Sequence, residues 1–402
     1  MKKIILSVAV ATMALSTTAS ALEDIKVNGE AKVWYETDNV GTPGDMFNKT
    51  DASAEVVFKL GMTGKQGDVS FGAELTQGST MGLKGVLVND VRTSANNLDN
   101  QTGTGDVYVS KSYIVAPVVA DTIVKLGRQE LNTPFAFTEK WNAQQNNFDA
   151  AVFVNSSVSN LTLIGAYVGQ TNTAGDHKAT QEFNKLFNGA FAAGALYKAD
   201  SLFVNAWAYE LPSVAKAFWA DAGMSVGPVA LKAYVAAMMP SDTSAAGADN
   251  TVGFALSGAT DVSGIKLFVA ASMVGEDGIL PLGNVATGFK KTKLPTAGVY
   301  TDGVYTAQPG STAVKVKAAG KVGSTGLALQ AVSNTNSNDS SWASFHGESA
   351  DALDTTEIDL IVSQKVGAFN LKGIVMHRMF ADDTTDDASG GQHVRVVASV
   401  KF

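Results

Sequence analysis

The chain has 402 residues, of which 17% are charged and 45% are hydrophobic, with a mean hydropathy of +0.07 and a net charge of −8. No run of about 20 apolar residues follows the N-terminus, which excludes a helical membrane protein, and the absence of Cys excludes a disulfide scaffold. The charged fraction is below the roughly 25% of soluble globular proteins, and small residues, including 39 Gly, take the place of charged ones. An all-β chain remains: a soluble solenoid, an array of sandwich domains or a transmembrane barrel.

The first 21 residues have the three parts of a secretory signal peptide. Lys2 and Lys3 are positively charged, Ile4–Leu15 is an apolar stretch too short to span a bilayer, and Ala19-Ser20-Ala21 is a cleavage site of small residues. The mature chain, starting at Leu22, then has 28 basic and 38 acidic residues and a net charge of −10. This acidity argues against the binding of nucleic acid, whose phosphates attract basic proteins.

Apolar and polar residues alternate along most of the mature chain. In the segment 25–35, odd positions such as Val27 and Val33 are mostly apolar, whereas even positions such as Lys26 and Glu30 are mostly polar. A repeat of two residues fits a β-strand, whose side chains point to opposite faces in turn, and does not fit a helix, whose repeat is about 3.6 residues. The sequence therefore predicts strands throughout the mature chain.

Short and long connections alternate between the predicted strands. Turns rich in Gly, Asn, Asp and Pro join strands in pairs, as at 64–67 and 227–228, whereas the connections between pairs are mostly long and polar, as at 78–105 and 275–310. This asymmetry is typical of outer-membrane barrels, which have short periplasmic turns and long external loops. The predicted strands are 25–36, 51–63, 68–77, 106–116, 121–129, 148–155, 160–170, 189–198, 201–210, 216–226, 229–239, 250–260, 264–274, 312–322, 325–333, 356–365, 368–379 and 391–402.

The number and length of these strands fit a closed barrel. Most are close to the 9–11 residues, roughly, that a tilted strand needs to cross a bilayer. An open sheet edge in lipid would leave backbone groups unpaired at a cost of several kcal/mol each, so the first strand is expected to pair with the last. We predict an all-β fold, a closed antiparallel transmembrane β-barrel of eighteen strands over residues 22–402. Sixteen strands is the alternative, because 148–155 and 325–333 are short.

The last strand ends in Phe402 and has apolar residues at every second position before it, such as Val396 and Val400. This pattern resembles the C-terminal signature of bacterial outer-membrane barrels. The resemblance implies an outer-membrane location and implies that Phe402 is an assembly signal, read by the barrel assembly machinery.

A second resemblance comes from the segment Lys125-Leu-Gly-Arg-Gln-Glu-Leu-Asn-Thr-Pro134. It is similar to the same region of eighteen-stranded OprD-like porins, and looks closest to the major outer membrane porins of epsilonproteobacteria. The resemblance implies that the third long loop, here 130–147, folds into the barrel and narrows the pore. It also implies a homotrimer, in which small outward residues (Gly29, Ala31, Ala52 and Ala54) would let neighbouring walls approach. The chain lacks a strongly basic arginine ladder, which argues against phosphate specificity.

An apolar outward face implies a polar face toward the lumen. The loop 130–147 contributes Glu130, Glu139 and Lys140 as candidates for the pore constriction, and the wall contributes Lys32, Arg128, Arg378 and Arg395. Lys125 is at an odd position and Arg128 at an even position of one predicted strand. Their side chains therefore point to opposite faces, and only one of them can face the lumen in mid-strand. The alternative for each charge is a solvated rim, where salt screens it beyond about 8 Å. The charged residues expected on the lumen face are Lys26, Glu30, Lys32, Glu55, Lys59, Lys315, Lys317, Glu357, Asp359, Lys372, Arg378, Arg395 and Lys401.

Signals for catalysis and metal binding are weak. The G-x-S-x-G match at 223–227 places Ser225 inside a predicted strand, not at the strand–turn–helix elbow that a nucleophile of this type requires. His377 and His393 are predicted to point to opposite faces of the sheet. The loop acids fit either a divalent cation that bridges lipopolysaccharide or a solvated loop tip, and we favour the tip; they are Asp382, Asp383, Asp386 and Asp387. We predict no enzyme, no cofactor and no catalytic site.

The leading interpretation is an outer-membrane porin, a water-filled channel for passive diffusion of ions and small hydrophilic solutes, in contact with membrane lipid and lipopolysaccharide. A barrel of eighteen strands is wide enough to leave an aqueous channel. The net charge of −10, with Glu130 and Glu139 at the constriction, predicts a weak preference for cations. The alternative is a non-conducting barrel that acts as an adhesin, a structural protein or a surface hydrolase.

Overall fold

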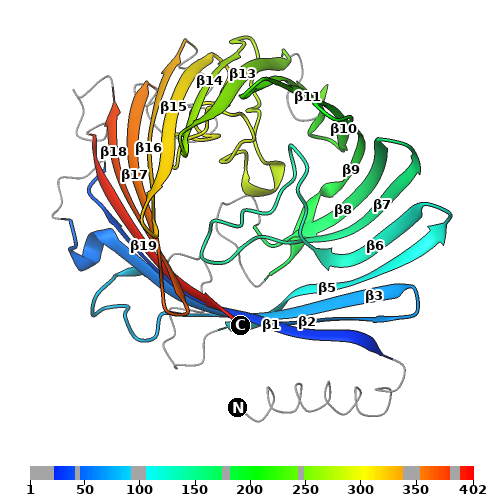
Figure 1. Ribbon diagram of the computed structural model, residues 1–402, viewed down its shortest axis with the longest axis horizontal. Coiled ribbons are helices and arrows are strands. Elements are labelled where there is room, and N and C mark those ends of the chain that lie inside the picture. The colour runs from blue at the N-terminus through cyan, green and yellow to red at the C-terminus, as the bar shows by residue number, and fades with distance from the viewer. Residues whose placement is uncertain are drawn as a thin grey trace.

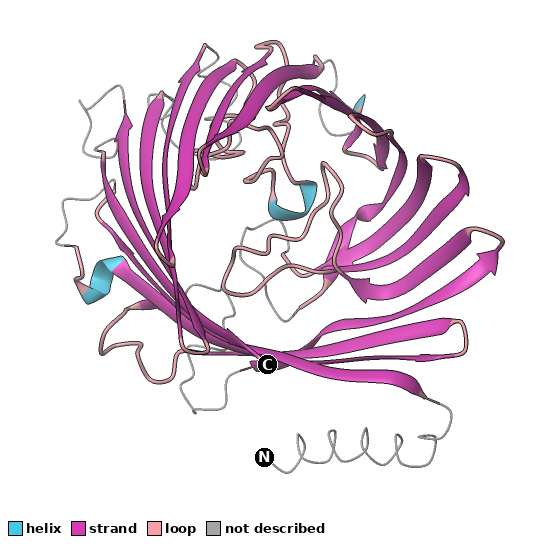
Figure 2. Ribbon diagram, viewed as in Figure 1, coloured by secondary structure: helices cyan, strands magenta, loops and turns pink. Residues whose placement is uncertain are grey.

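The computed structural model describes residues 22–40, 46–91, 106–173, 182–242, 249–337, 354–380 and 390–402. Within these residues a single ring of β-strands surrounds a lumen, and two long connections fold into it (Figure 1). The described helices are short turns (Figure 2), and none of them is long and apolar enough to cross a membrane. The predicted signal peptide, residues 1–21, lies outside the described residues.

Eighteen long strands form the ring, and the two-residue strand β4 (Asp90–Val91) adds to the start of β2 in parallel. The predicted number of strands is confirmed, and the alternative of sixteen is wrong. The long strands are β1 (Glu23–Asp38), β2 (Ala52–Gln66), β3 (Val69–Ser79), β5 (Asp106–Val119), β6 (Thr122–Gln129), β7 (Phe148–Val158), β8 (Leu161–Thr171), β9 (Asn184–Lys198), β10 (Leu202–Leu211), β11 (Ala215–Val226), β12 (Val229–Pro240), β13 (Thr251–Val262), β14 (Ile265–Val274), β15 (Ser311–Val322), β16 (Thr325–Asn336), β17 (Thr355–Val366), β18 (Phe369–Phe380) and β19 (Gly391–Lys401).

Backbone pairing closes the sheet. Each long strand pairs antiparallel with the next, and β1 pairs with β19 over the residues from Glu30 to Asp38. At one end of this seam Gly29 N donates to Phe402 O at 2.8 Å, and Phe402 N donates to Gly29 O at 3.1 Å. The ring therefore has no open edge, which is the condition that lipid imposes on a sheet. The predicted antiparallel closure is confirmed.

The two ends of the barrel differ in their connections. At one end, here called the turn end, short turns of mostly two residues join the strands. Left-handed residues in them, such as Gly67 (φ 56°) and Asn160 (φ 63°), give the backbone twist that such hairpins favour. At the other end, here called the loop end, most connections are long. Strands also extend farther toward this end than predicted: β9 begins at Asn184 and not at 189, because hydrogen bonding to β8 continues beyond the apolar part of the strand.

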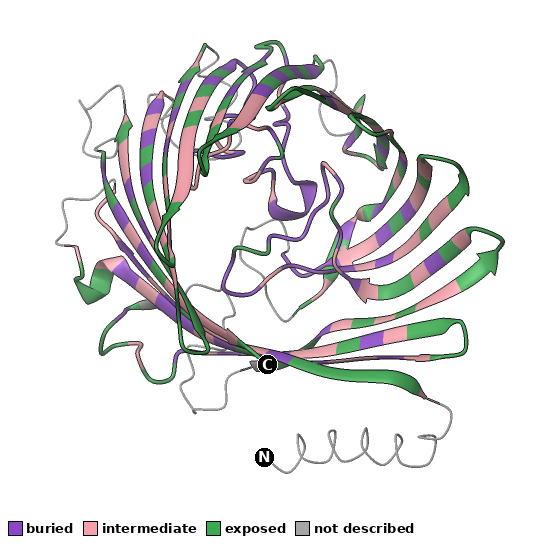
Figure 3. Ribbon diagram, in the orientation of Figure 1, coloured by how far each residue is buried: buried purple, intermediate pink, exposed green. Residues whose placement is uncertain are grey.

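Side chains alternate between two environments along the strands (Figure 3). On β1, Val27 and Val33 are 66% and 44% exposed on the outside, whereas Trp34 points inward and is 2% exposed. Residues that pair across neighbouring strands point to the same face, so the pairing shows which residues of each strand face inward. Every charged residue expected on the lumen face lies on the inner side of its strand. The middle of the outer face thus presents an apolar belt, as a wall in contact with lipid requires.

Small outward residues on β1 and β2 are covered by the chain itself. Val88, from the segment before β4, is buried together with Ala52 and Ala54. The ring of Phe402 covers Gly29, where an added Cβ would lie 2.3 Å from the ring. The expectation that Gly29, Ala52 and Ala54 let a neighbouring wall approach is therefore wrong, because these positions are already filled from within the chain.

Two connections fold into the ring from the loop end. The first is the segment 130–147 after β6, and the second is the segment 275–310 after β14, which contains the short helix η3 (Val285–Thr287). They meet inside the lumen, where Val285 N donates to Phe135 O at 2.9 Å and Asn284 Nδ2 donates to Phe137 O at 3.0 Å. The second insertion is not predicted by any sequence pattern, because its Gly- and Thr-rich composition matches that of an ordinary external loop.

The inserted segments bury an apolar cluster against one half of the wall. Phe135 is fully buried between Tyr209 on β10 and Trp219 on β11, edge-to-face, with ring centroids 5.5 and 5.6 Å away. Leu282 of the second segment joins the same cluster. The inner face of β7–β14 is therefore largely apolar, contrary to the expectation of a polar lumen face, because the inserted segments cover its loop end.

We predict that Gly29→Ala weakens the closing seam. The added Cβ would collide with the ring of Phe402 and with the Lys59 carbonyl oxygen, which lies 2.9 Å away, and displacing the ring would cost its contact with Phe58. Overpacking of this kind costs about 1–3 kcal/mol. The melting temperature of the purified barrel, followed by the mobility shift of unheated samples in gels, should fall. Gly373→Ala is the control, because a Cβ there meets nothing within 4 Å; an equal fall in both variants would contradict the prediction.

Candidate pore constriction

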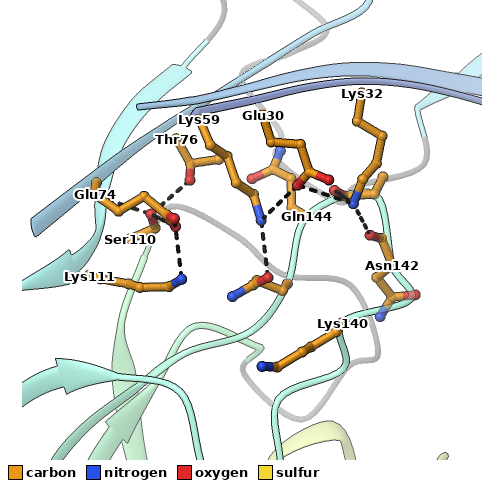
Figure 4. A network of polar contacts seen from close by, with 12 residues as sticks. Glu30, Lys32, Lys59, Glu74, Thr76, Ser110, Lys111, Lys140, Asn142 and Gln144 are labelled. Atoms are coloured by element: carbon orange, nitrogen blue, oxygen red, sulfur yellow. Dashed lines mark hydrogen bonds and ion pairs between the residues drawn. The ribbon is translucent and has the colours of Figure 1, made fainter. Parts of the chain in front are cut away.

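Side chains of β1, β2 and β5 tie the segment 130–147 to the neighbouring part of the barrel wall (Figure 4). Lys32 Nζ donates to the carbonyl oxygens of Asn142 and Ala143, at 3.2 and 3.4 Å. Lys59 Nζ donates to Gln145 Oε1 at 3.1 Å, and Gln144 donates to the buried carboxylate of Glu55. The tip of the segment is thus fixed to this part of the wall by lysines that donate hydrogen bonds to its backbone and amide oxygens.

Glu130 is the centre of the charge network at the base of this segment. It accepts from Lys111 at 2.6 Å, from Lys140 at 2.5 Å and from Gln145 Nε2 at 2.6 Å. Burial disfavours the charged carboxylate, but these hydrogen bonds and charges outweigh it and lower the pKa of Glu130 to about 2. Glu130 therefore stays ionised at any physiological pH and holds two cations beside the lumen.

Glu139 has a different role from the one expected for it. Its side chain is fully buried, and it accepts from Asn142 Nδ2 at 2.9 Å and from Asn284 Nδ2 at 3.1 Å. Burial raises the pKa of the Glu139 carboxyl, against the attraction of Lys291. The expectation of a pore-lining Glu139 is wrong, because this side chain joins the two inserted segments and does not face water.

The second segment, 275–310, is anchored to the wall by its backbone. Glu357 on β17 accepts from the consecutive N–H groups of Val299, Tyr300 and Thr301, at 2.6, 3.0 and 2.6 Å for the shortest contacts. Three converging N–H groups form a cavity for an anion, which here is filled by a carboxylate of the wall. This contact holds the segment against β17.

Tyr300 provides a further anchor near the loop end. Its hydroxyl lies 2.7 Å from His393 Nε2 and accepts from Arg395, which also donates to Glu36 Oε2 at 3.0 Å. The Arg395 guanidinium lies 4.4 Å from the ring of Trp34. Arg395 is therefore buried in a network that joins the wall to the segment 275–310.

Two hollows lie along the segment 130–147, and the constriction is between them. The outer hollow, about 290 Å³, is lined by the basic residues Lys290, Lys291, Arg378 and Arg395, together with Trp141, Tyr300 and Tyr305. The inner hollow, about 390 Å³, is lined by five lysines and three glutamates: Lys32, Lys59, Lys111, Lys140, Lys401, Glu30, Glu74 and Glu130. Residues 140–145 contribute to both hollows, so the tip of this segment separates them and marks the candidate constriction.

The structure places the predicted constriction residues in three groups. Lys32, Glu130 and Lys140 line the inner hollow, and Arg378 and Arg395 line the outer one. Glu139 is buried between the two inserted segments, as described above. The prediction for Arg128 is wrong: its side chain is on the outer face of β6, where it forms an ion pair with Asp149 at 2.8 Å.

The reason for the error at Arg128 is the phase of β6. Arg128 shares the parity of Leu126, which is 38% exposed on the outside, whereas Lys125 and Gln129 point inward. The alternation alone could not show whether Lys125 or Arg128 faces the lumen. The buried Gln129 shows that the odd positions of β6, including Lys125, point inward. Sequence patterning also missed Lys290 and Lys291, because they belong to the second inserted segment, and Lys111, because a bulge in β5 turns it inward.

The other sequence features considered for catalysis or metal binding form no such site among the described residues. Ser225 is inside β11, so the G-x-S-x-G match has no nucleophile elbow. His377 and His393 lie on opposite faces, as their positions on β18 and β19 require. The acidic residues Asp382, Asp383, Asp386 and Asp387 lie outside the described residues. In the part of the chain that the structure describes, no group of three or more acidic, His or Cys side chains could hold a metal ion.

Comparison with known proteins shows the fold. No family model matches the sequence, and no curated protein matches it. Solved structures that are similar include OccK9 (OpdG) of Pseudomonas aeruginosa, with a TM-score of 0.72, 13% identity and coverage of 94% of this chain and 98% of that one. OpdO of Pseudomonas aeruginosa has a TM-score of 0.72, 13% identity and coverage of 96% and 99%. OccAB3 of Acinetobacter baumannii has a TM-score of 0.70, 10% identity and coverage of 94% and 99%. The chain thus has the fold of the OprD-like porins that its sequence resembles.

We predict that Glu130→Gln loosens the segment 130–147. The neutral amide would lose the ion pairs to Lys111 and Lys140, whose charges would then be left without their shared partner. Hydrogen exchange of peptides from this segment, measured by mass spectrometry at neutral pH, should accelerate. The matched control is Glu210→Gln, which removes an exposed pair with Lys216 at 4.0 Å. Unchanged exchange in Glu130→Gln would show that the network does not hold the segment.

The pH dependence of the same contact has a defined sign. The pKa of Glu130 is lowered from 4.5 to about 2, so its stabilising effect is complete above about pH 4.5 and is lost as the pH falls toward 2. Near-UV circular dichroism of the wild type should therefore be constant down to about pH 4.5 and change below it. In Glu130→Gln this part of the acid transition should be absent, and an identical transition in both proteins would contradict the assignment.

Proposed function

With a barrel of this fold as the premise, we propose that the chain forms a water-filled channel in the outer membrane of a Gram-negative bacterium, through which ions and small hydrophilic solutes diffuse passively. The observation that carries the proposal is the pair of polar hollows that follow one another through the lumen of a barrel whose outer wall is apolar. An eighteen-stranded barrel leaves an aqueous channel unless it is fully plugged. The proposal includes no catalytic role.

The arrangement of charges supports a preference for anions. Among the described residues that line the two hollows, nine side chains are basic and three are acidic. The weak cation preference expected from the net charge depended on Glu130 and Glu139, but Glu139 is buried and Glu130 is neutralised by two lysines. Because the field is strongest where low-dielectric walls are closest, the charges at the constriction matter more than the net charge of the chain. We therefore propose anion preference in place of cation preference.

Single-channel recording tests the channel itself. Folded protein reconstituted into a planar bilayer should give discrete conductance steps in KCl. An absence of steps from protein whose fold is verified by circular dichroism would favour the alternative, a non-conducting barrel whose external loops act in adhesion or at the cell surface.

We predict a reversal potential of the anion-selective sign across a KCl gradient. Removing two cations from the outer hollow, in Lys291→Gln with Arg378→Gln, should shift the reversal potential toward zero, and the shift should shrink as salt rises. The control is Lys216→Gln, because Lys216 is 69% exposed on the outer side of β11. A cation-selective wild type would show that the described charges do not control the constriction.

Assembly and partners are proposed from the resemblance. A homotrimer remains the proposal, although the surface first expected for it is covered by the chain. An outward apolar depression of about 670 Å³ across β11–β14, lined by small residues such as Ala222, Ala233 and Gly258, is a surface where another wall could approach closely. Lipid and lipopolysaccharide are expected around the apolar belt, and Phe402 is proposed as the signal for the barrel assembly machinery. Cross-linking in mild detergent should give trimers in the wild type and only monomers in Gly258→Trp.

A further inference from the structure

His393 is buried at the closing seam of the barrel, in contact with the second inserted segment. Its side chain is 3% exposed, and its residue pairs with Asp38 across the seam. On one side of the imidazole, Nδ1 lies 3.3 Å from Asp38 Oδ2 of β1. On the other side, Nε2 lies 2.7 Å from the Tyr300 hydroxyl of the segment 275–310 and 3.5 Å from Glu36 Oε2 of β1. The imidazole therefore joins the wall to the segment.

The hydrogens of this contact can be assigned for a neutral His393. A carboxylate only accepts hydrogen bonds, so Nδ1, which faces Asp38, carries the ring proton. Nε2 is then an acceptor, and the Tyr300 hydroxyl donates its single hydrogen to it. The same hydroxyl oxygen accepts from Arg395. In this state Nε2 and Glu36 Oε2, 3.5 Å apart, are two acceptors that face each other with no hydrogen between them.

A proton on Nε2 removes this conflict. The imidazolium donates from Nδ1 to Asp38 and from Nε2 to the Tyr300 oxygen. The Tyr300 hydrogen then turns to Glu36 Oε2, which lies 3.3 Å from the hydroxyl oxygen. Tyr300 thus bridges the imidazolium and the Glu36 carboxylate, and hydrogen bonds to ionised groups are stronger than those between neutral groups. The segment is held more firmly to the wall when His393 carries a charge.

The charges in contact with the imidazole favour this protonated form. β1 contributes the carboxylates of Glu36 and Asp38, and β19 contributes the guanidinium of Arg395, which pairs with Glu36. Two negative charges and one positive charge leave one negative charge in excess around a neutral imidazole. An imidazolium neutralises this excess inside the wall, where an unpaired charge is costly.

Other elements packed near His393 contribute cations that oppose its protonation. Arg378 on β18 is the pairing partner of Gly391, so it lies diagonally from His393 at roughly 7–8 Å between Cβ atoms. The segment contributes Lys290 and Lys291 to the same hollow, and Lys291 pairs with Asp302 at 3.2 Å. The two carboxylates that contact the ring directly outweigh these more distant charges.

We propose that His393 is a pH-sensitive clamp, which fastens the segment 275–310 to β1 and β19 as the imidazole takes up a proton. Histidine is the side chain whose charge ordinarily changes between about pH 5 and 8. The Asp38 side chain is 45% exposed at the loop end and gives protons a path from water to the ring. Tyr300 and Arg395 line the outer hollow, so the clamp fixes the wall of the passage in acid. Only this last step rests on the proposed channel function.

Hydrogen exchange of the folded barrel across a pH series tests the clamp. The reporters are the N–H groups of Val299, Tyr300 and Thr301, which donate to Glu357 and therefore exchange when the segment leaves the wall. After correction for the intrinsic pH dependence of amide exchange, their protection should rise roughly tenfold from about pH 7.5 to about pH 5.5. This is the factor that one hydrogen bond to a charged group provides at the low end of its range. Protection that is constant or falls over these pH values would overturn the proposal.

Variants assign the response to His393. His393→Gln keeps a hydrogen-bonding side chain but takes up no proton, so the rise in protection should vanish. His377→Gln is the matched control, because His377 is on the outer face of the neighbouring strand β18, and this variant should keep the full rise. Tyr300→Phe removes the hydroxyl that joins the ring to the segment, and it should also abolish the rise if His393→Gln does not fold. A rise that persists in folded His393→Gln would assign it to another group, such as Glu357, and overturn the proposal.

Single-channel current connects the clamp to the passage. In about 1 M KCl, where charge effects are screened beyond about 3 Å, the wild type should show fewer current fluctuations at about pH 5.5 than at about pH 7.5. His393→Gln should fluctuate equally at both pH values. Equal fluctuations in the wild type would overturn the link between the clamp and the passage. If the wild type gives no current while its hydrogen exchange responds to pH, the channel proposal fails and the clamp stands.

Discussion

The pairing of β1 with β19 is the interaction on which the rest of the structure depends. In lipid no water is present to satisfy backbone N–H and C=O groups, so a sheet is stable there only as a closed ring. The seam is completed by the reciprocal hydrogen bonds of Gly29 and Phe402, and the ring of Phe402 fits over Gly29 because that position has no side chain. Closure fixes the register, and the register fixes which side chains face the lumen.

The inserted segments divide the lumen unequally. On the side of β7–β14 they form a core with the wall, in which Phe135, Tyr209 and Trp219 pack edge-to-face. On the other side they are held by charged and polar groups, including Lys32 and Glu357, which bind their backbone atoms. The remaining passage therefore runs along the basic wall. The same hydrogen bonds that position the segments also set the charge of the constriction.

Several acidic residues are buried away from this passage, whereas many basic side chains line it. The glutamates Glu55, Glu139 and Glu357 are fully buried and accept hydrogen bonds from the inserted segments, so they contribute to structure more than to the field in water. Lysine and arginine side chains are long enough to reach the passage while their stems pack on the wall. For this reason a chain with net charge −8 has a predominantly basic lining at its constriction.

The sequence by itself determined the barrel. A repeat of two residues, alternating short and long connections and an even number of strands were sufficient for the closed eighteen-stranded ring, since each is a local consequence of strand geometry and of lipid. The same alternation assigned the inward charges of β1, β2 and β15–β19. Only the tertiary structure decided the site: that 275–310 folds inward, that Glu139 is buried against Asn284, and that Arg128 points outward. These facts depend on contacts between residues far apart in the chain, which no local pattern encodes.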